Sequence, residues 1–301
     1  MKLSNKSQGI AWAIISSFWI SIMLCIVRYV SEYYNSYVIV FWRLLFSLLF
    51  MMPWVVRNGV GALKTERINL FLFRAVVGIV AMLIWFYALG MMPLPQATAL
   101  SFTGPIFTTI AAIIVLKERP GIYRISAILI GFIGVLIIIR PGVSEFNMAS
   151  LLVLSSTSLW AVAAIAIKKL SDTEAPQVIT FYMAFMMTPM ALIPAVLFWQ
   201  EVNSYHLFWL GLMGLTSNFA HTALSKALSK TDVTAIMPYD FIRLVFVGLL
   251  AYLIFNDQTN IYDILGSVVI IGSNIYISHR ETLKRKQEVK NSKALRRILS
   301  G

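Results

Sequence analysis

The stretch "RYVSE" at residues 28–32 returns as "KKLSD" at residues 168–172, and this recurrence is the first indication of the fold. In both places it follows an apolar run that is long enough to form a helix across a membrane. A second match, "ERPGIY" at 118–123 with "DQTNIY" at 257–262, has nearly the same offset. A nearly constant offset between weak matches indicates an internal repeat. We therefore expect the chain to consist of two equivalent halves.

The composition places both halves in a membrane. Of the 301 residues, 59% are hydrophobic and only 13% are charged, whereas soluble proteins average about 25% charged residues. Runs of about 20 apolar residues, enough to cross ~30 Å of hydrocarbon as a helix, recur along the whole chain. We predict ten spans, at 9–30, 36–56, 70–90, 96–116, 122–140, 148–168, 177–199, 205–225, 233–255 and 261–279.

The basic residues predict how these spans are oriented. Most of the 25 Lys and Arg lie at the N-terminus, in alternate loops and in the C-terminal tail. On this count Arg74, at the start of the third span, is assigned to the same side as the loop before it. The opposite side holds only Arg28 and Arg140, while Arg43 and Arg243 lie within spans. By the positive-inside rule both termini are cytoplasmic, which requires an even number of spans.

The same distribution explains the net charge of +12 without a nucleic-acid partner. The basic tail, residues 281–301, could contact the anionic headgroups of membrane lipids, although a tail that stays in water and only fixes the topology is the favoured interpretation.

The two halves, residues 1–142 and 147–280, each hold five predicted spans. Because five is odd, the halves must cross the membrane in opposite directions. Inverted repeats of this kind are typical of secondary transporters, in which the substrate binds near mid-membrane between the halves. We therefore expect an all-α polytopic membrane protein with ten transmembrane helices in two inverted five-helix repeats. Its function would be to move a small molecule by alternating access.

Polar residues within the spans break the repeat and so mark a candidate substrate site. Arg43 corresponds to Met183, and Asp240 to Ser101, in the other half. A scaffold residue should tend to appear in both halves, whereas a residue that binds an asymmetric substrate need not. We predict substrate binding by polar and aromatic residues of four spans, namely Arg43, Trp85, Asn218, His221, Tyr239, Asp240 and Arg243.

Each of these residues also has a purely structural interpretation. Asp240 and Arg243 are three residues apart and can form an ion pair on one helix face. Arg43 fits either a substrate carboxylate or phosphate, or carbonyl groups of a neighbouring helix. His221 fits proton coupling or an ordinary hydrogen bond. Trp85 and Tyr239 fit stacking on a planar or cationic substrate, or packing and anchoring at the membrane interface.

Three stretches carry a resemblance to a known family: "FWRLLFSLLFMMP" (41–53), "FYALGMMPLPQATALSFTGPIFTTIAAIIVLKE" (86–118) and "LIGFIGVLII" (129–138). With them the chain resembles the drug/metabolite transporter superfamily in its EamA-type branch of ten-helix carriers. The resemblance implies two five-helix bundles around a central cavity, a small organic substrate and a bacterial cytoplasmic membrane. Many relatives carry Glu before the Pro of Gly104-Pro105, and this chain does not.

A narrower resemblance concerns "PYDFIRLV" (238–245) and "YLIFND" (252–257), which are similar to a subgroup that includes S-adenosylmethionine uptake carriers. A drug or amino-acid exporter of the same fold is the alternative function. A membrane-embedded enzyme is a remote one, because the chain has no HExxH, phosphate-binding loop or G-x-S-x-G motif. We therefore expect no enzymatic activity, cofactor or metal site, and the oligomeric state stays open.

Overall fold

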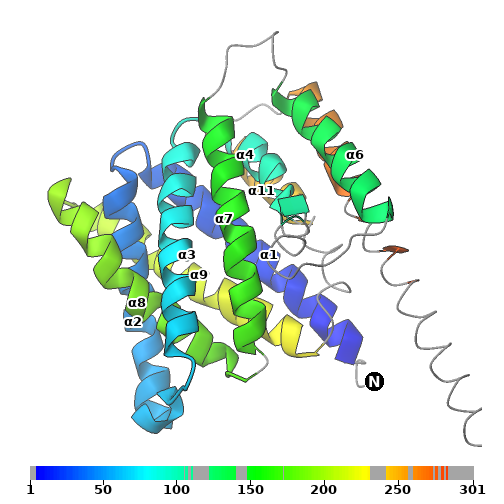
Figure 1. Ribbon diagram of the computed structural model, residues 1–301. Coiled ribbons are helices and arrows are strands. Elements are labelled where there is room, and N and C mark those ends of the chain that lie inside the picture. Colours follow the sequence, from blue (N-terminus) through cyan, green and yellow to red (C-terminus); the bar gives the residue numbers. More distant parts are fainter. Residues whose placement is uncertain are drawn as a thin grey trace, which may run out of the picture.

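A computed structural model of the chain describes residues 5–104, 106–107, 110, 122–139, 148–171, 173–230, 242–256, 260–273, 275–276, 279–280 and 283. The described structure is helical (Figure 1). Its helices are α1 (Asn5–Val30), α2 (Ser36–Asn58), the 3-10 helix η1 (Val60–Leu63), α3 (Ile68–Leu89), α4 (Leu94–Ser101), α6 (Ile122–Ile139), α7 (Met148–Ser171), α8 (Pro176–Leu197), α9 (Ser204–Lys230), α11 (Ile242–Phe255) and the helix Ile261–Ser273. Each of the ten predicted spans overlaps one described helix.

Five helices of the described chain are long and apolar enough to cross a membrane. They are α1 from Ser7 onward, α2, α3, α7 as far as Ile167, and the whole of α8. The helices α11 and Ile261–Ser273 are apolar but shorter. Large hydrophobic side chains lie on the surface of the spans, as Ile193 of α8 and Leu253 of α11 do at 67% exposed each. Such exposed side chains suit a helix that faces lipid.

The packing of the helices follows the repeat. Under an exchange of the halves, α1 corresponds to α7, α2 to α8, α3 to α9 and α4 to α11. The contact of α1 with α9 has its counterpart in α3 with α7, that of α2 with α9 in α8 with α3, and that of α1 with α11 in α7 with α4. The pairs α2–α8 and α4–α11 are each their own counterpart. The neighbours are therefore arranged with a pseudo-two-fold relation, as an inverted repeat requires.

The last helix of each half also meets its counterpart. A Cβ on Gly134 of α6 would lie 2.9 Å from the carbonyl oxygen of Gly266, and a Cβ on Gly266 would lie 2.6 Å from that of Gly134. Only glycine lets the two backbones come this close. These two glycines therefore hold α6 against the helix Ile261–Ser273.

Turns from opposite halves meet at both ends of the bundle. The upper junction in Figure 1 joins the α1–α2 turn (31–35) to the α8–α9 segment (198–203). There the backbone N–H of Asn35 donates to Gln200 Oε1 at 2.7 Å, and Asn35 Nδ2 donates to the Phe198 carbonyl oxygen at 2.8 Å.

The lower junction is related to the upper one by exchange of the halves. It joins the α2–α3 loop (59–67) to the α7–α8 turn and the helix ends beside it. Thr65 Oγ1 donates to Glu174 Oε1 at 2.7 Å, and Arg67 Nη1 donates to the Lys169 carbonyl oxygen at 2.8 Å. A cleft of about 990 Å³ opens here between the loop and α8, lined by Lys64, Tyr182 and their neighbours.

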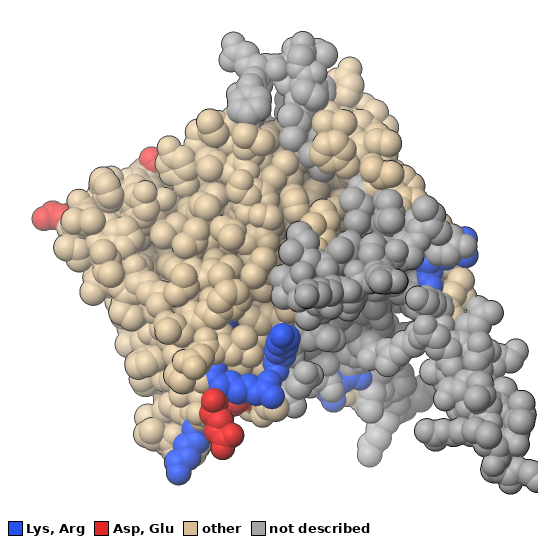
Figure 2. Space-filling model, in the orientation of Figure 1, with Lys and Arg blue, Asp and Glu red and all other residues tan. Residues whose placement is uncertain are grey.

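Charge gathers at the end of the bundle that holds the lower junction. Figure 2 shows that the Lys and Arg side chains visible on this face lie along the lower end of the helices and at the right-hand edge. Most of the remaining described surface in this view is uncharged. In the sequence, the same asymmetry appears as the gathering of Lys and Arg in alternate loops.

Candidate substrate site

A row of hydrogen-bonded polar side chains joins α2 of the first half to α9 of the second. We call it the polar seam; it consists of Arg43 and Ser47 of α2 with Ser217, Asn218 and His221 of α9. Arg43 is only 2% exposed and donates from Nη2 to Ser217 Oγ at 2.7 Å. The same nitrogen lies 3.5 Å from Nε2 of His221. Three of the seven predicted site residues therefore lie in one cluster.

The second contact of the polar seam fixes how closely α2 and α9 approach. Ser47 Oγ donates to Asn218 Oδ1, and Asn218 Nδ2 donates to the backbone carbonyl oxygen of Ser47 at 2.8 Å. Next to this pair, Gly214 leaves no room for a side chain, because a Cβ there would lie 2.6 Å from Phe46 Cβ and 3.0 Å from the Ser47 nitrogen. The backbone of α9 thus packs directly against α2 beside the polar seam.

The two-fold counterpart of this row contains no polar group. It consists of Met183 and Met187 of α8 with Gly78, Ile79 and Met82 of α3, and we call it the apolar seam. Both α8 methionines are buried, at 2% and 0% exposed. The two seams touch, because Arg43 Nη1 lies 3.0 Å from Met82 Sδ and its guanidinium lies 5.8 Å from the ring centre of Phe86.

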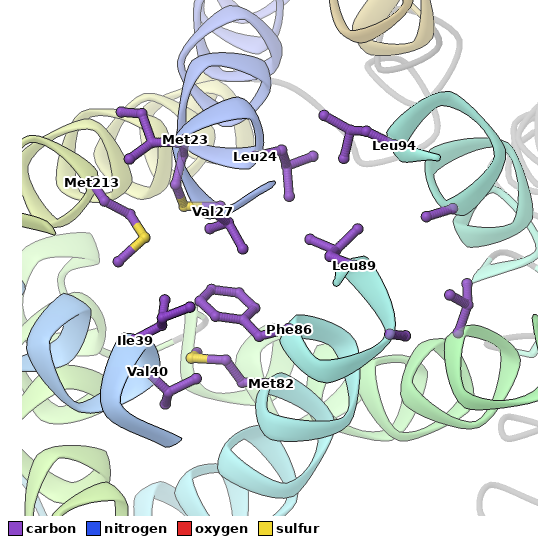
Figure 3. Packing of buried hydrophobic residues seen from close by; sticks show 14 of the residues in the cluster. Met23, Leu24, Val27, Ile39, Val40, Met82, Phe86, Leu89, Leu94 and Met213 are labelled. Carbon is purple, nitrogen blue, oxygen red and sulfur yellow. The ribbon is translucent and has the colours of Figure 1, made fainter. Parts of the chain in front are cut away.

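The surroundings of Arg43 on this side are apolar. Figure 3 shows Met82 and Phe86 of α3 pointing toward Ile39 and Val40 of α2, with side chains of α1 close by. Ile39 and Val40 are fully buried. An ionised side chain in such a place costs about 2.5–3.5 kcal/mol on membrane-insertion scales, so its counter-charge matters for the function.

A second buried arginine, Arg74 of α3, lies near Arg43. The side chain of Arg74 is 2% exposed, and its acceptor among the described residues is the sulfur of Met187, 3.6 Å from Nη1. The positive charges of Arg43 and Arg74 repel each other, and both act on His221. The basic residues counted with the loop before α3 thus include one arginine that is buried within the helix bundle. Its place seven residues into α3, within "FLFRAVVG" (71–78), is the signal that could have identified it.

The other predicted residues lie elsewhere or outside the described chain. Arg243 of α11 contacts α1 and α4, since its carbonyl oxygen accepts from Ser21 Oγ at 3.5 Å and its guanidinium lies 5.0 Å from the Phe102 ring centre. Trp85 is half-buried and packs against the hydrophobic core. Tyr239 and Asp240 lie outside the described residues, and so does the predicted Asp240–Arg243 ion pair. Among the residues described, no group of three or more His, Cys, Asp or Glu is placed to hold a metal ion.

Comparison with known proteins identifies the family. The sequence model of the EamA-like transporter family matches residues 7–140 and matches again over residues 147–278. The chain belongs to the EamA-like transporter family. A crystal structure with 14% sequence identity, covering 94% of this chain and 99% of its own, superimposes with a TM-score of 0.66 and has the same fold.

Curated relatives of this EamA-family chain are transporters. The S-adenosylmethionine uptake transporter of Rickettsia prowazekii (strain Madrid E) is 31% identical over 95% of this chain and 98% of its own length. The riboflavin transporter of Vibrio cholerae is 29% identical over 93% of this chain and 96% of its own. The pseudopaline exporter CntI of Pseudomonas aeruginosa is 27% identical over 92% and 98%. The protein is therefore a multi-pass membrane transporter of a small molecule.

Proposed function

We propose that the protein is a secondary carrier that takes up S-adenosylmethionine, or a closely similar amino-acid or nucleoside solute, and releases it chemically unchanged. The observation that most directly supports this proposal is the polar seam, in which Arg43 of one half donates a hydrogen bond to Ser217 of the other. A site built from both halves changes its access when the halves move against each other, which is what alternating access requires. The relatives with S-adenosylmethionine uptake names support the choice of substrate.

The site residues of this proposal are Arg43, Asn218 and His221, which the described structure brings together, and Tyr239, Asp240, Arg243 and Trp85, which stay predictions. Transport needs no cofactor in this scheme. Substrate gradients or ion gradients drive it.

We also propose that the upper junction faces the periplasm and the lower junction the cytoplasm of a bacterial cell. The Lys and Arg at the lower end of the helices support this orientation. Both termini would then be cytoplasmic. The basic tail at 281–301 would contact anionic lipids of the inner leaflet and no nucleic acid.

Counterflow in proteoliposomes tests the carrier. Vesicles that contain the purified protein and unlabelled S-adenosylmethionine should transiently accumulate labelled S-adenosylmethionine above protein-free vesicles. Arg43→Gln should reduce this accumulation, whereas Arg57→Gln, which removes the same charge from the exposed end of α2, should not. If the wild type moves riboflavin or another solute and leaves S-adenosylmethionine outside under every gradient, the substrate assignment is wrong.

Growth of cells tests the direction. A bacterial strain that cannot make S-adenosylmethionine should grow on the external compound when it expresses an uptake carrier. An exporter, the alternative function, would fail this test and would instead lower the intracellular level of its solute or raise drug tolerance.

A further inference from the structure

Two cations of the described chain lie within the helix bundle without a counter-ion. Arg43 and Arg74 are each 2% exposed. The carboxylates in the described part of the chain belong to Glu32, Glu66, Glu174, Glu201 and Asp263; the four glutamates lie in turns, and Asp263 lies on the helix Ile261–Ser273. None of these carboxylates is within ion-pair distance of either arginine. Buried charges in proteins are normally paired, so the two arginines lack an anion within the part of the chain that the structure describes.

The hydrogen bonds of the two guanidinium groups are incomplete as well. Nε of Arg43 and Nε of Arg74 are buried and have no hydrogen-bond partner among the residues that the structure describes. Arg43 has one neutral hydroxyl acceptor, Ser217, and Arg74 has a thioether sulfur at the long distance of 3.6 Å. A guanidinium carries five N–H donors in a planar fork that matches a carboxylate. The unused donors are therefore of the kind that an oxyanion would accept from.

Gly78 and two methionines lie beside the two arginines. Arg74, Gly78 and Met82 are four residues apart and thus share one face of α3. Met82 contacts Arg43, and Met187 contacts Arg74. A Cβ added at Gly78 would meet Met187 at 3.6 Å and Arg74 Nη1 at 3.9 Å, which are ordinary contact distances. The flexible methionine side chains above Gly78 can be displaced by a ligand more easily than branched side chains.

We infer that Arg43 and Arg74 together bind the carboxylate of the transported metabolite, between the polar and the apolar seam at Gly78. The inference rests on the proposed carrier function and specifies its substrate class as small metabolites with a free carboxylate. Two of the solutes in the names of the relatives, S-adenosylmethionine and pseudopaline, contain carboxylates, whereas riboflavin has none. Binding of the carboxylate gives each arginine a negatively charged acceptor and reduces their mutual repulsion.

Competition for labelled S-adenosylmethionine uptake tests this class. S-adenosylhomocysteine, which keeps the carboxylate and lacks the sulfonium charge, should compete. Its methyl ester, methylthioadenosine and riboflavin, which have no free carboxylate, should compete about 10-fold to 100-fold less well, the usual effect of losing charge-assisted hydrogen bonds. Flavin mononucleotide adds a phosphate arm, and if it competes better than S-adenosylhomocysteine, a phosphate site replaces the proposed carboxylate site.

Two variants assign the effect to Arg74. Arg74→Gln should raise the KM for S-adenosylmethionine about 10-fold to 100-fold and should remove the preference for the acid over its methyl ester. Gly78→Ala retains every charge and introduces only ordinary contacts, yet it should weaken the carboxylate-bearing competitors because the methyl group occupies the space of the anion. Arg57→Gln should change neither value. An Arg74→Gln variant that is monodisperse and keeps the wild-type KM and acid preference overturns the inference.

Thermal stabilisation of the detergent-solubilised protein separates this inference from the proposed function. Free acids should raise the Tm more than their amides or esters do, and the difference should disappear in Arg74→Gln. If acids stabilise the protein in this way and S-adenosylmethionine is not moved, the substrate assignment fails and the carboxylate site stands. If S-adenosylmethionine is moved and acids and esters act equally, the carrier stands and the carboxylate site fails.

Discussion

The polar seam and the apolar seam occupy equivalent places in the two-fold arrangement and differ in chemistry. Arg43, Ser47 and Ser217 of the polar seam have Met183, Met187 and Gly78 as their counterparts. The helices around both seams keep the same neighbours. The scaffold of this chain thus accommodates either chemistry at equivalent places, so the asymmetric residues are not fixed by the helix packing.

Arg74 belongs to neither seam, but it is a cation that contacts Met187 of the apolar seam. Its counterpart is Met213, a fully buried residue of α9. The cation of the polar seam, Arg43, comes from α2, whereas Arg74 comes from α3 and lies beside the apolar seam. A substrate carboxylate bound as inferred above would therefore meet positive charge from both helices.

The largest expected effect comes from removing the cation of the polar seam. Arg43→Gln leaves Ser217 without its charged donor and should lower counterflow of S-adenosylmethionine about 10-fold to 100-fold. The matched change in the apolar seam, Met183→Leu, nearly conserves volume and should stay close to wild type. Rates are compared at equal amounts of reconstituted protein. Equal losses in the two variants would show that the seams do not differ in function.

A smaller effect is expected where α9 packs against α2. Gly214→Ala places a methyl group 2.6 Å from Phe46 Cβ and should destabilise the protein by about 1–3 kcal/mol. Its counterpart in the repeat is the buried Ala75, for which Ala75→Gly should cost about 0.5–1 kcal/mol. Thermal unfolding in detergent measures both. An unchanged Tm for Gly214→Ala would mean that the close approach of α2 and α9 is not needed for stability.

The smallest expected effect is that of His221→Gln. The 3.5 Å separation of His221 Nε2 from Arg43 is long for a hydrogen bond. We expect flux to fall by less than about fivefold, which corresponds to roughly 1 kcal/mol. Met82→Leu, which nearly conserves volume at the counterpart of His221, should have a similarly small effect. Complete loss of flux in a well-expressed His221→Gln protein would instead indicate that the histidine takes part in ion coupling.

The sequence predicts the scaffold well because apolar length and loop charge are local properties. Each predicted span overlaps a described helix, and the family model matches the chain twice. The repeat can be recognised in the sequence because matching residues at the helix ends of the two halves keep a nearly constant offset. The boundaries of the two halves, placed at 1–142 and 147–280, stay a prediction.

The site was less predictable because its contacts join helices that are distant in sequence. Asn218 could be selected from its mid-span polarity, but its partner Ser47, 171 positions away, could not. Arg74 was overlooked because a basic residue near a helix start fits the charge rule equally well. Its place seven residues into α3 and its buried side chain distinguish it from an exposed loop residue such as Lys64.

The two junctions have a mechanical consequence for α2 and α8. The upper junction joins the first end of α2 to the last end of α8. Beside the lower junction, Val55 near the last end of α2 lies in one hydrophobic cluster with Phe181 near the first end of α8. The two helices also pack against each other between these points. Because α2 and α8 run antiparallel and touch at both ends, a change in the angle between them would separate their ends at one junction and would also move Arg43, which lies on α2.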